Sequence, residues 1–415
     1  MPEWISPDIG YVLLFFMLFV FPRFLQRLGL PSALTALAIG VAVGQGTGLF
    51  HDDQTINLLS TLGIVALFLF AGLDVETHEL RREAAALTEH LMVRVVLVAG
   101  AAWLCRWLFG LDIRAALLVS LALLTPSTGF ILDSLAGWGL SESERFWVRS
   151  KAIATELIAL AILFGAVQST SVERLGGSAV ALVAMIVVLP IIFRWFAAVV
   201  VPHAPKSEFG LLMTVAAACA LITRSLGVYY LVGAFVVGMA ARRFRTALPS
   251  LASNQMLGSV EAFASIFVPF YFFHAGLALP ASTFGWQSIA TGAAFAAVVL
   301  PLRLLAVVVH RRLRFGESVK HSLRVGVPML PTTVFTLVIV EILRMSFEVP
   351  PHVRGGLIVY AIVSTLAPSI WMRGPAPEFD AELQLGVVTP VAPAEDALDE
   401  DPSRTPASVT APPAG

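Results

Sequence analysis

The clearest candidate for chemistry in this sequence is a carboxylate inside an apolar run. Glu156 follows Thr155 in the stretch Lys151–Leu157, which opens into a long apolar segment. An ionisable side chain inside a membrane-spanning segment is costly and marks a functional site by default. Because burial and nearby positive charge shift a carboxyl pKa in opposite directions, such a group can exchange a proton for a cation. We predict that Glu156, with Thr155, binds the ion and the proton; the alternative is a structural ion-pair partner.

Two helix-breaking stretches lie in the middle of apolar runs. Thr125-Pro126-Ser127-Thr128-Gly129 interrupts one run, and Pro331-Thr332-Thr333 interrupts another. Proline leaves helical backbone groups free, and hydrocarbon tolerates such groups only where protein or water satisfies them. Paired interruptions in two halves of a chain point to a transporter's ion site, whereas capping of kinked helices is the alternative. The hydroxyl groups predicted to complete the oxygen shell of a cation are those of Thr125, Ser127, Thr128, Thr332 and Thr333.

Three further charged residues lie in apolar surroundings. Asp133 follows the first break and is either a second carboxylate of the site or a helix-end residue that faces the cytoplasm. Arg303 keeps its charge under physiological conditions, so we predict a charge-compensating, structural role. It would bond to the carbonyls of a broken helix or to Glu156. Arg94 lies nearer the end of its apolar run, and we expect its side chain to reach the membrane surface.

Other polar residues are weaker candidates. His274 lies in an aromatic run, where a core histidine or a proton sensor is possible. Glu341 and Arg344 have the spacing of an ion pair on one helix face, and Glu261 shows no particular pattern. The sequence contains no nucleophile elbow, phosphate-binding loop or metal-ligand cluster. We therefore expect neither an enzyme nor a cofactor, and no metal beyond a transported cation.

The composition indicates a membrane protein. Of the 415 residues, 57% are hydrophobic and 13% are charged, whereas a soluble domain carries about 25% charged residues. The apolar runs are continuous rather than alternating, which favours membrane helices over a β-barrel. Cys105 and Cys219 fall inside apolar runs and imply buried thiols without a disulfide. No basic cluster suggests binding to nucleic acid.

Hydropathy predicts an all-α polytopic fold of about 13 transmembrane helices. The spans lie near residues 9–28, 31–46, 56–73, 90–109, 113–138, 145–168, 177–201, 207–225, 228–245, 259–277, 285–310, 318–345 and 353–372. Lys and Arg are concentrated in alternate loops, which places the N-terminus outside and the C-terminus in the cytoplasm. The N-terminus lacks signal-peptide features, so we expect the first span to be retained.

The membrane domain is predicted to occupy residues 1–373. Residues 374–415 are rich in Pro, Ala, Asp and Glu with few aromatic residues, which is typical of a disordered acidic tail. This tail is too short and too polar for a nucleotide-binding regulatory domain.

Three sequence elements recur in the same order in the two halves of the chain. The segment from Leu28 to Gly40 matches that from Leu226 to Gly238, and Ala71-Gly72-Leu73 matches Ala275-Gly276-Leu277. The third match is the pair of proline breaks. Because seven predicted helices separate the paired elements, the two copies must enter the membrane in opposite orientations. The sequence therefore predicts an inverted repeat.

The order and spacing of several motifs resemble the cation:proton antiporter (sodium/proton exchanger) superfamily, and within it the bacterial Kef-type branch. The motifs are Leu28-Gly29-Leu30-Pro31, Leu67-Phe68-Leu69-Phe70-Ala71-Gly72-Leu73-Asp74, Thr125-Pro126-Ser127-Thr128, Lys206-Ser207-Glu208, Leu226-Gly227, Gly233-Ala234-Phe235 and Phe272-Phe273-His274-Ala275-Gly276-Leu277. The resemblance implies a mobile core bundle beside a dimerisation domain. It also implies that the fifth and twelfth spans are crossed, discontinuous helices and that the sixth supplies the carboxylate.

The sequence departs from the family pattern at three positions. The family usually has Asp where this chain has Glu156, often preceded by Asp, Asn or Gln rather than by Thr155. Asp133 replaces a residue that is more often polar or basic. Arg303 replaces a Lys that often pairs with the carboxylate. These departures leave the identity of the ion-binding groups to be tested.

These patterns together predict a secondary-active antiporter that exchanges Na⁺ or K⁺ for H⁺ by alternating access, with one-for-one exchange as the simplest stoichiometry. We expect a multi-pass homodimer in the bacterial inner membrane. The alternatives are a symporter or anion carrier on the same fold, a non-transporting membrane sensor with a decayed ion site, and a channel.

Overall fold

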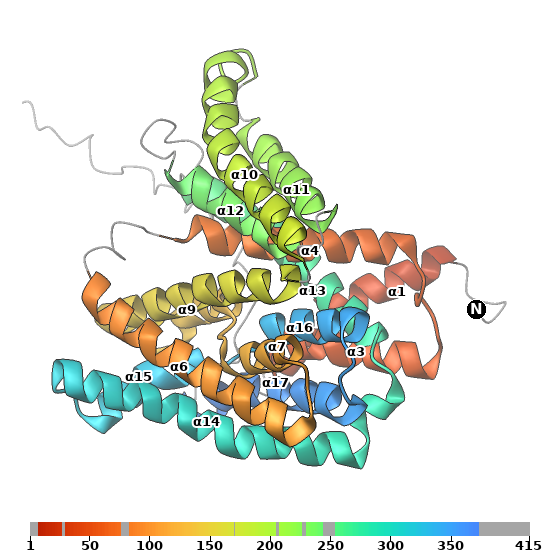
Figure 1. The fold of residues 1–415 in the computed structure, drawn as a ribbon. Helices are drawn as coiled ribbons and strands as arrows, with labels where there is room; N and C mark the ends of the chain where they lie inside the picture. Colours follow the sequence, from red (N-terminus) through yellow and green to blue (C-terminus); the bar gives the residue numbers. More distant parts are fainter. Residues whose placement is uncertain are drawn as a thin grey trace, which may run out of the picture. The chain divides into compact units, whose positions relative to one another are not determined.

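The computed structural model describes residues 7–26, 30–75, 83–169, 171–204, 207–225, 230–243 and 254–372. Within these ranges the regular structure is entirely helical, as Figure 1 shows, which confirms the predicted all-α class. Nine of the described helices are long and apolar enough to cross a membrane, or ten if one bent pair counts as a single span. Three shorter apolar helices lie where three further spans were expected. The count of 13 stays a prediction, and residues 374–415 lie outside the described part.

The bounds of the described helices follow the hydropathy pattern closely. They are α1 (Pro7–Phe19), α2 (Phe21–Gln26), α3 (Ser32–Gly46), α4 (Gln54–Leu73), α6 (Ala84–Phe109), α7 (Ile113–Leu124), α8 (Thr128–Ser134), η1 (Leu135–Trp138), α9 (Glu142–Gln168), α10 (Val172–Val199), α11 (Glu208–Ser225), α12 (Tyr230–Arg243), α13 (Asn254–Leu277), η4 (Ala281–Phe284), α14 (Trp286–Phe315), α15 (Val319–Gly326), η5 (Val327–Met329), α16 (Thr333–Ser346) and α17 (Pro351–Met372). The main differences are that α6, α10 and α13 begin earlier and α14 ends later than predicted. Basic residues in the last turn of α14 extend that helix beyond its apolar run, until Gly316 ends it in the left-handed conformation, with φ 66°.

Both predicted interruptions are present. The first run stops at Leu124, passes through extended backbone at Thr125 and Ser127, and resumes as α8. The second run is helical as α15 and η5, breaks at Leu330-Pro331-Thr332, and resumes as α16 at an angle of 46°. Proline has no amide hydrogen to continue the helical ladder, which explains why each break is centred on one.

The helices that carry the predicted site belong to one packed neighbourhood. The broken helices contact each other through α7 and α16, and α9 packs against α6, α7 and α8. On the other flank α14 packs along α17, and α17 packs against α16. A second set of contacts joins α4 to α12 and α13, and α3 to α13. Cys105 and Cys219 are buried and free, as predicted.

Two pairs of glycines let the helices of the second set approach closely. A Cβ atom on Gly72 of α4 would lie 3.0 Å from Cα of Gly238 on α12. A Cβ atom on Gly40 of α3 would likewise lie 3.0 Å from Cα of Gly276 on α13. The sequence repeat equates Gly40 with Gly238 and Gly72 with Gly276, so each contact maps onto the other. The inverted orientation of the two copies stays a prediction.

Replacing Gly72 with Ala is expected to destabilise the protein. The methyl group would overlap the carbonyl oxygen of Phe235, and overpacking of this kind costs about 1–3 kcal/mol. Gly100 is a matched control, because a Cβ atom there meets only open space and alanine is favoured over glycine within a helix by about 0.5–1 kcal/mol. Thermal unfolding in detergent should give Gly72→Ala a lower midpoint than wild type and Gly100→Ala an equal or higher one. A Gly72→Ala midpoint at or above wild type would contradict the close approach.

Candidate functional site

Glu156 lies in the interior of α9. The helix begins at a capping box in which Ser141 and Glu144 satisfy each other's backbone amide groups. From this start the helix runs without interruption past α7 and α8, so Glu156 reaches the level of the first break. Its side chain is only 2% exposed. The sequence therefore places a carboxylate where neither water nor lipid headgroups can solvate it.

The carboxyl group of Glu156 meets the first break at Thr128. It interacts with both the hydroxyl group and the backbone amide of that residue. Even so, Oε2 of Glu156 and Oγ1 of Thr128 are buried without a well-formed hydrogen bond to any described residue. Glu156 also forms no ion pair within the described part of the chain, so the alternative of a structural ion-pair partner finds no support there. Two adjacent buried oxygens thus have unused capacity to bind a ligand.

The two breaks are hydrogen-bonded to each other through Ser127. Its amide donates to the carbonyl oxygen of Pro331 at 2.9 Å. Its hydroxyl oxygen accepts from the amides of Val334 and Phe335 at 3.1 and 3.4 Å, at the start of α16. Thr336 on α16 adds a 2.8 Å bond from its hydroxyl to the carbonyl oxygen of Ala122 on α7. Capping, the alternative considered for the hydroxyls, is therefore what Ser127 does in this structure.

The other predicted hydroxyl ligands have different surroundings. Oγ1 of Thr332 lies 3.2 Å from Oγ of Ser364 on α17, and Thr333 forms a hydroxyl–hydroxyl contact with Thr365 on the same helix. Thr125 is buried and lines a small cavity instead. Among the five, Thr128 is the one whose interaction with Glu156 the structure records.

Arg303 holds the ends of both broken helices. It is 1% exposed, and its guanidinium group donates to the carbonyl oxygens of Met329 at 2.5 Å, Leu330 at 2.8 Å and Leu123 at 3.4 Å. The sequence predicted that Arg303 binds either the carbonyls of a broken helix or Glu156. The structure shows the carbonyls and, among the described residues, no ion pair between Arg303 and Glu156.

Tyr360 on α17 completes this arrangement and was not predicted. Its hydroxyl group accepts from Arg303 at 3.0 Å and donates to the carbonyl oxygen of Leu123 at 2.7 Å. A single tyrosine in an apolar run has no distinctive pattern in the sequence. Only the packing of α17 against the breaks shows its role.

The expectation for Arg94 was wrong. Its side chain is 3% exposed, and Nε and Nη1 have no hydrogen-bond partner among the described residues. The cause is the earlier start of α6 at Ala84, which places Arg94 well inside the helix. Arg94, Thr125 and Thr155 line a cavity of about 10 Å³, which has room for about one water molecule.

Asp133 is part of α8, but its side chain lies outside the described features. Its two interpretations, a second carboxylate and a helix-end residue, therefore stay open.

A larger cavity of about 180 Å³ lies where the ends of α4, α13, α16 and α17 meet. We call it the polar cavity; the polar residues that line it include Asn57, Ser60, His274, Glu341, Arg344 and Arg354. Glu341 and Arg344 form the predicted ion pair, at 2.8 Å. His274 is half-buried at the wall of this cavity rather than enclosed in the core.

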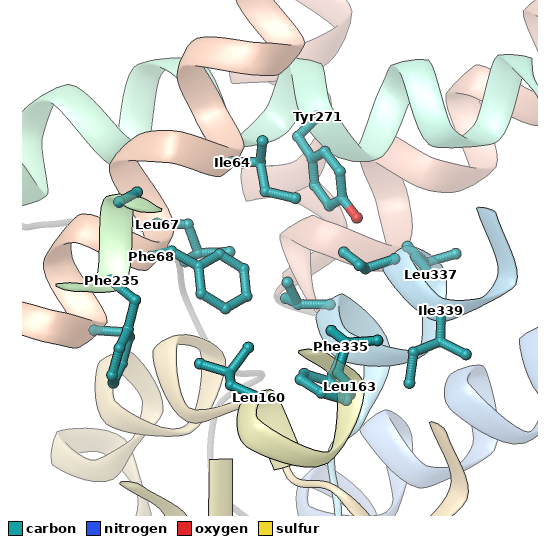
Figure 2. Close-up of a cluster of buried hydrophobic side chains, with 14 of the residues drawn as sticks. Ile64, Leu67, Phe68, Leu160, Leu163, Phe235, Tyr271, Phe335, Leu337 and Ile339 are labelled. Carbon is teal, nitrogen blue, oxygen red and sulfur yellow. The ribbon is translucent and has the colours of Figure 1, made fainter. Parts of the chain in front are cut away.

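Apolar side chains separate the polar cavity from Glu156. Ile64, Tyr271 and Leu337 line the cavity and also belong to the cluster shown in Figure 2. Leu160, one helical turn beyond Glu156 on α9, is part of the same cluster. Apart from the hydroxyl group of Tyr271, these four side chains are apolar. The cluster therefore places hydrophobic packing between the polar cavity and α9, and we call it the seal.

Comparison with known families decides the class of the protein. The model of the family described as sodium/hydrogen exchanger, transmembrane, matches residues 12–374. The chain belongs to the sodium/hydrogen exchanger family. This family consists of ion antiporters, so the chain is a transporter rather than an enzyme. The assignment to the Kef-type branch within the superfamily stays a prediction.

Individual relatives of this exchanger are distant but cover most of its length. It is 20% identical to the Na⁺/H⁺ antiporter of Enterococcus hirae over 365 residues, which is 82% of this chain and 90% of that protein. It is 22% identical to the Na⁺/H⁺-K⁺ antiporter GerN of Bacillus cereus over 264 residues, 60% of this chain and 66% of the relative. The sodium proton antiporter MjNhaP1 of Methanocaldococcus jannaschii has the same fold, with a TM-score of 0.64, 13% identity and coverage of 88% of this chain and 95% of that structure.

Proposed function

We propose that this exchanger transports Na⁺ or K⁺ against H⁺ and that both substrates use Glu156. The observation that carries the proposal is the buried carboxyl group beside Thr128, in which one oxygen of each residue lacks a hydrogen-bond partner among the described residues. The two relatives named as Na⁺/H⁺ and Na⁺/H⁺-K⁺ antiporters support a monovalent cation as the second substrate. The names of these two relatives differ in the cation, so the proposal includes both Na⁺ and K⁺.

Exchange follows from the fact that one carboxylate cannot hold a proton and a cation at once. When Glu156 is protonated it is neutral and suited to its buried position. When it loses the proton, its negative charge attracts a cation, and the hydroxyl oxygen of Thr128 adds a second ligand. Backbone carbonyls or retained water would supply the remaining ligands, and Asp133 stays a candidate. Arg303 keeps the two breaks together and takes no part in proton release, because its charge is fixed.

Alternating access requires that Glu156 be open to one side of the membrane at a time. In this structure the apolar cluster separates it from the polar cavity, which supports a conformation closed on that side. Movement of the bundle that contains α7, α9 and α16 against the second set of helices, which includes α13, would open the seal. We further propose that the protein is a homodimer of the bacterial inner membrane, with the basic loops in the cytoplasm.

Cysteine accessibility tests this closure. In a variant whose Cys105 and Cys219 are replaced by Ala, Asn57→Cys in the polar cavity should react rapidly with a charged thiol reagent under all conditions. Leu160→Cys, within the seal on the side of α9, should be protected at rest and react when a cation and a pH gradient drive turnover. Equal and rapid labelling of both positions at rest would contradict a closed seal.

The function itself is tested by proton movement in proteoliposomes that carry an imposed pH gradient. Addition of Na⁺ or K⁺ should collapse the gradient, while Li⁺ measures the tolerance of the site to a smaller ion. One-for-one exchange predicts that an imposed membrane potential leaves the rate unchanged. Anion-dependent flux would favour a carrier of another substrate, no flux would favour a sensor, and conductance far above carrier rates would favour a channel.

A further inference from the structure

A second group of titratable residues lies between α6, α9 and α14, apart from the broken helices. His90, Lys151 and His310 are 2%, 0% and 8% exposed. The ion exchange proposed at Glu156 uses none of them. A buried lysine and two buried histidines are costly to keep in a membrane protein, which calls for a function.

The contacts within this group define where protons can lie. Nζ of Lys151 is 3.0 Å from Nδ1 of His310. An ammonium group can only donate, so with Lys151 charged, Nδ1 of His310 accepts and its ring proton lies on Nε2. That nitrogen is 3.5 Å from Oε2 of Glu89, a carboxylate that is 49% exposed. The Lys151–His310 pair therefore lies between the interior and a carboxylate that water can reach, and Nε2 of His310 is close to that carboxylate without a hydrogen bond to it.

The inner end of the group reaches Thr155, the residue that precedes Glu156 on α9. Nε2 of His90 is 3.3 Å from Oγ1 of Thr155, and the hydroxyl of Thr155 donates to the carbonyl oxygen of Lys151 at 2.7 Å. Because that hydroxyl proton is used, His90 must be the donor to Thr155, with its proton on Nε2. The rings of His90 and His310 are 5.9 Å apart, and Thr155 is adjacent to Glu156 in the sequence.

The surrounding charges leave Lys151 without a carboxylate partner. Arg311 pairs with Glu317 at 2.6 Å, and Arg314 lies 3.6 Å from Glu89. The other charges that face the group are those of Arg94 on α6 and, at the surface, Glu89 itself. Among the described residues no Asp or Glu lies within ion-pair distance of Lys151. Its proton is shared with an imidazole, which can give it up and take it back, rather than fixed by an acid.

We propose that His310, Lys151 and His90 carry protons between the cytoplasmic surface at Glu89 and Thr155, beside the ion site. This inference rests on the proposed exchange at Glu156. Lys151 gives its proton inward to the unprotonated ring nitrogen of His90. The His310 ring then turns over, so that its N–H faces the neutral amine of Lys151 and its unprotonated nitrogen faces Glu89. It gives that proton to Lys151 and takes a replacement from protonated Glu89, which regains a proton from water. His90 accepts a proton at one ring nitrogen and releases another at the other. A water in the cavity beside Thr155 would complete the step to Glu156, so one proton enters and the charge of the group is restored.

The test separates proton delivery from cation binding. Proteoliposomes would carry wild type, His310→Gln, His90→Gln or the control His203→Gln, whose imidazole is exposed in the turn after α10. Two rates are measured in each: Na⁺-driven proton movement, and exchange of labelled Na⁺ for Na⁺ at equal pH, which needs no net proton transfer. In both buried variants proton movement should fall by about 100-fold, the lower end of what a positioned proton-transfer group contributes, while Na⁺/Na⁺ exchange and the control stay at wild-type rates.

Chemical rescue provides a second readout that a structural role would not move. Added imidazole should restore proton movement in His310→Ala but leave His203→Ala unchanged. An equal fall in both rates in the buried variants, or no fall in either, would overturn the relay while leaving the exchange function intact. Absence of both activities in wild type would overturn the exchange function and the relay with it.

Discussion

Glu156→Gln is expected to abolish cation-dependent proton movement in a correctly folded protein. The carboxamide has the size of the carboxyl group, but it cannot bind an exchangeable proton or balance a cation at a site that is 2% exposed. Removing one charge of a buried pair costs about 3–5 kcal/mol. Since about 1.4 kcal/mol corresponds to a factor of ten, cation affinity should fall at least about 100-fold.

Proton movement in proteoliposomes at several Na⁺ and K⁺ concentrations is the measurement. Glu173→Gln, at an exposed position near the start of α10, is the matched control and should behave as wild type. Glu156→Asp should retain the charge and part of the activity, because the shorter side chain moves the carboxylate away from Thr128. Undiminished exchange by folded Glu156→Gln protein would show that another group, with Asp133 the first candidate, binds the ions.

The parts of this site that could be predicted from the sequence are residues whose presence in an apolar helix costs free energy by itself. A carboxylate in an apolar run and a proline in the middle of a membrane helix are both expensive unless something compensates for them, so Glu156, Pro126 and Pro331 were apparent. The helices that surround them follow the hydropathy pattern, which is why the all-α class was also predictable.

Partners could not be predicted where they depend on which helix faces which. Ser127 looked like a cation ligand, yet its oxygen caps α16, a helix more than two hundred residues away in the sequence. Thr332 and Thr333 are engaged by hydroxyls of α17 that show no pattern of their own. Arg94 was assigned to a helix end because hydropathy located the start of α6 too late. These contacts are products of tertiary packing rather than of local sequence.

The structure assigns the two central charges of the membrane domain to different tasks. Glu156 is surrounded by unused hydrogen-bonding capacity, which suits a group that must change its partner during transport. Arg303 differs from Glu156, since its Nη1 and Nη2 already donate to carbonyls that the two breaks leave free, and its Nε is the one nitrogen without a partner among the described residues. A side chain that cannot release its proton is well suited to this fixed role. Arginine at this position therefore favours rigidity of the broken helices over a second titrating group.

Arg303→Met is accordingly expected to destabilise the fold rather than only to alter ion selectivity. It removes charge-assisted bonds to Met329 and Leu330, and such bonds contribute about 1.5–3 kcal/mol each, so the loss should reach about 3–6 kcal/mol. Tyr360→Phe is the matched control, because it removes only the hydroxyl contacts with Arg303 and Leu123 and should cost about 1 kcal/mol.

Thermal unfolding in detergent would give the order wild type, Tyr360→Phe, Arg303→Met from most to least stable. Arg303→Lys should fall between the last two, since a single ammonium group cannot replace the planar fork that reaches several carbonyls at once. If Arg303→Met were as stable as wild type but inactive, Arg303 would act on the transported ion instead. Its bonds to the broken helices would then be incidental to its function.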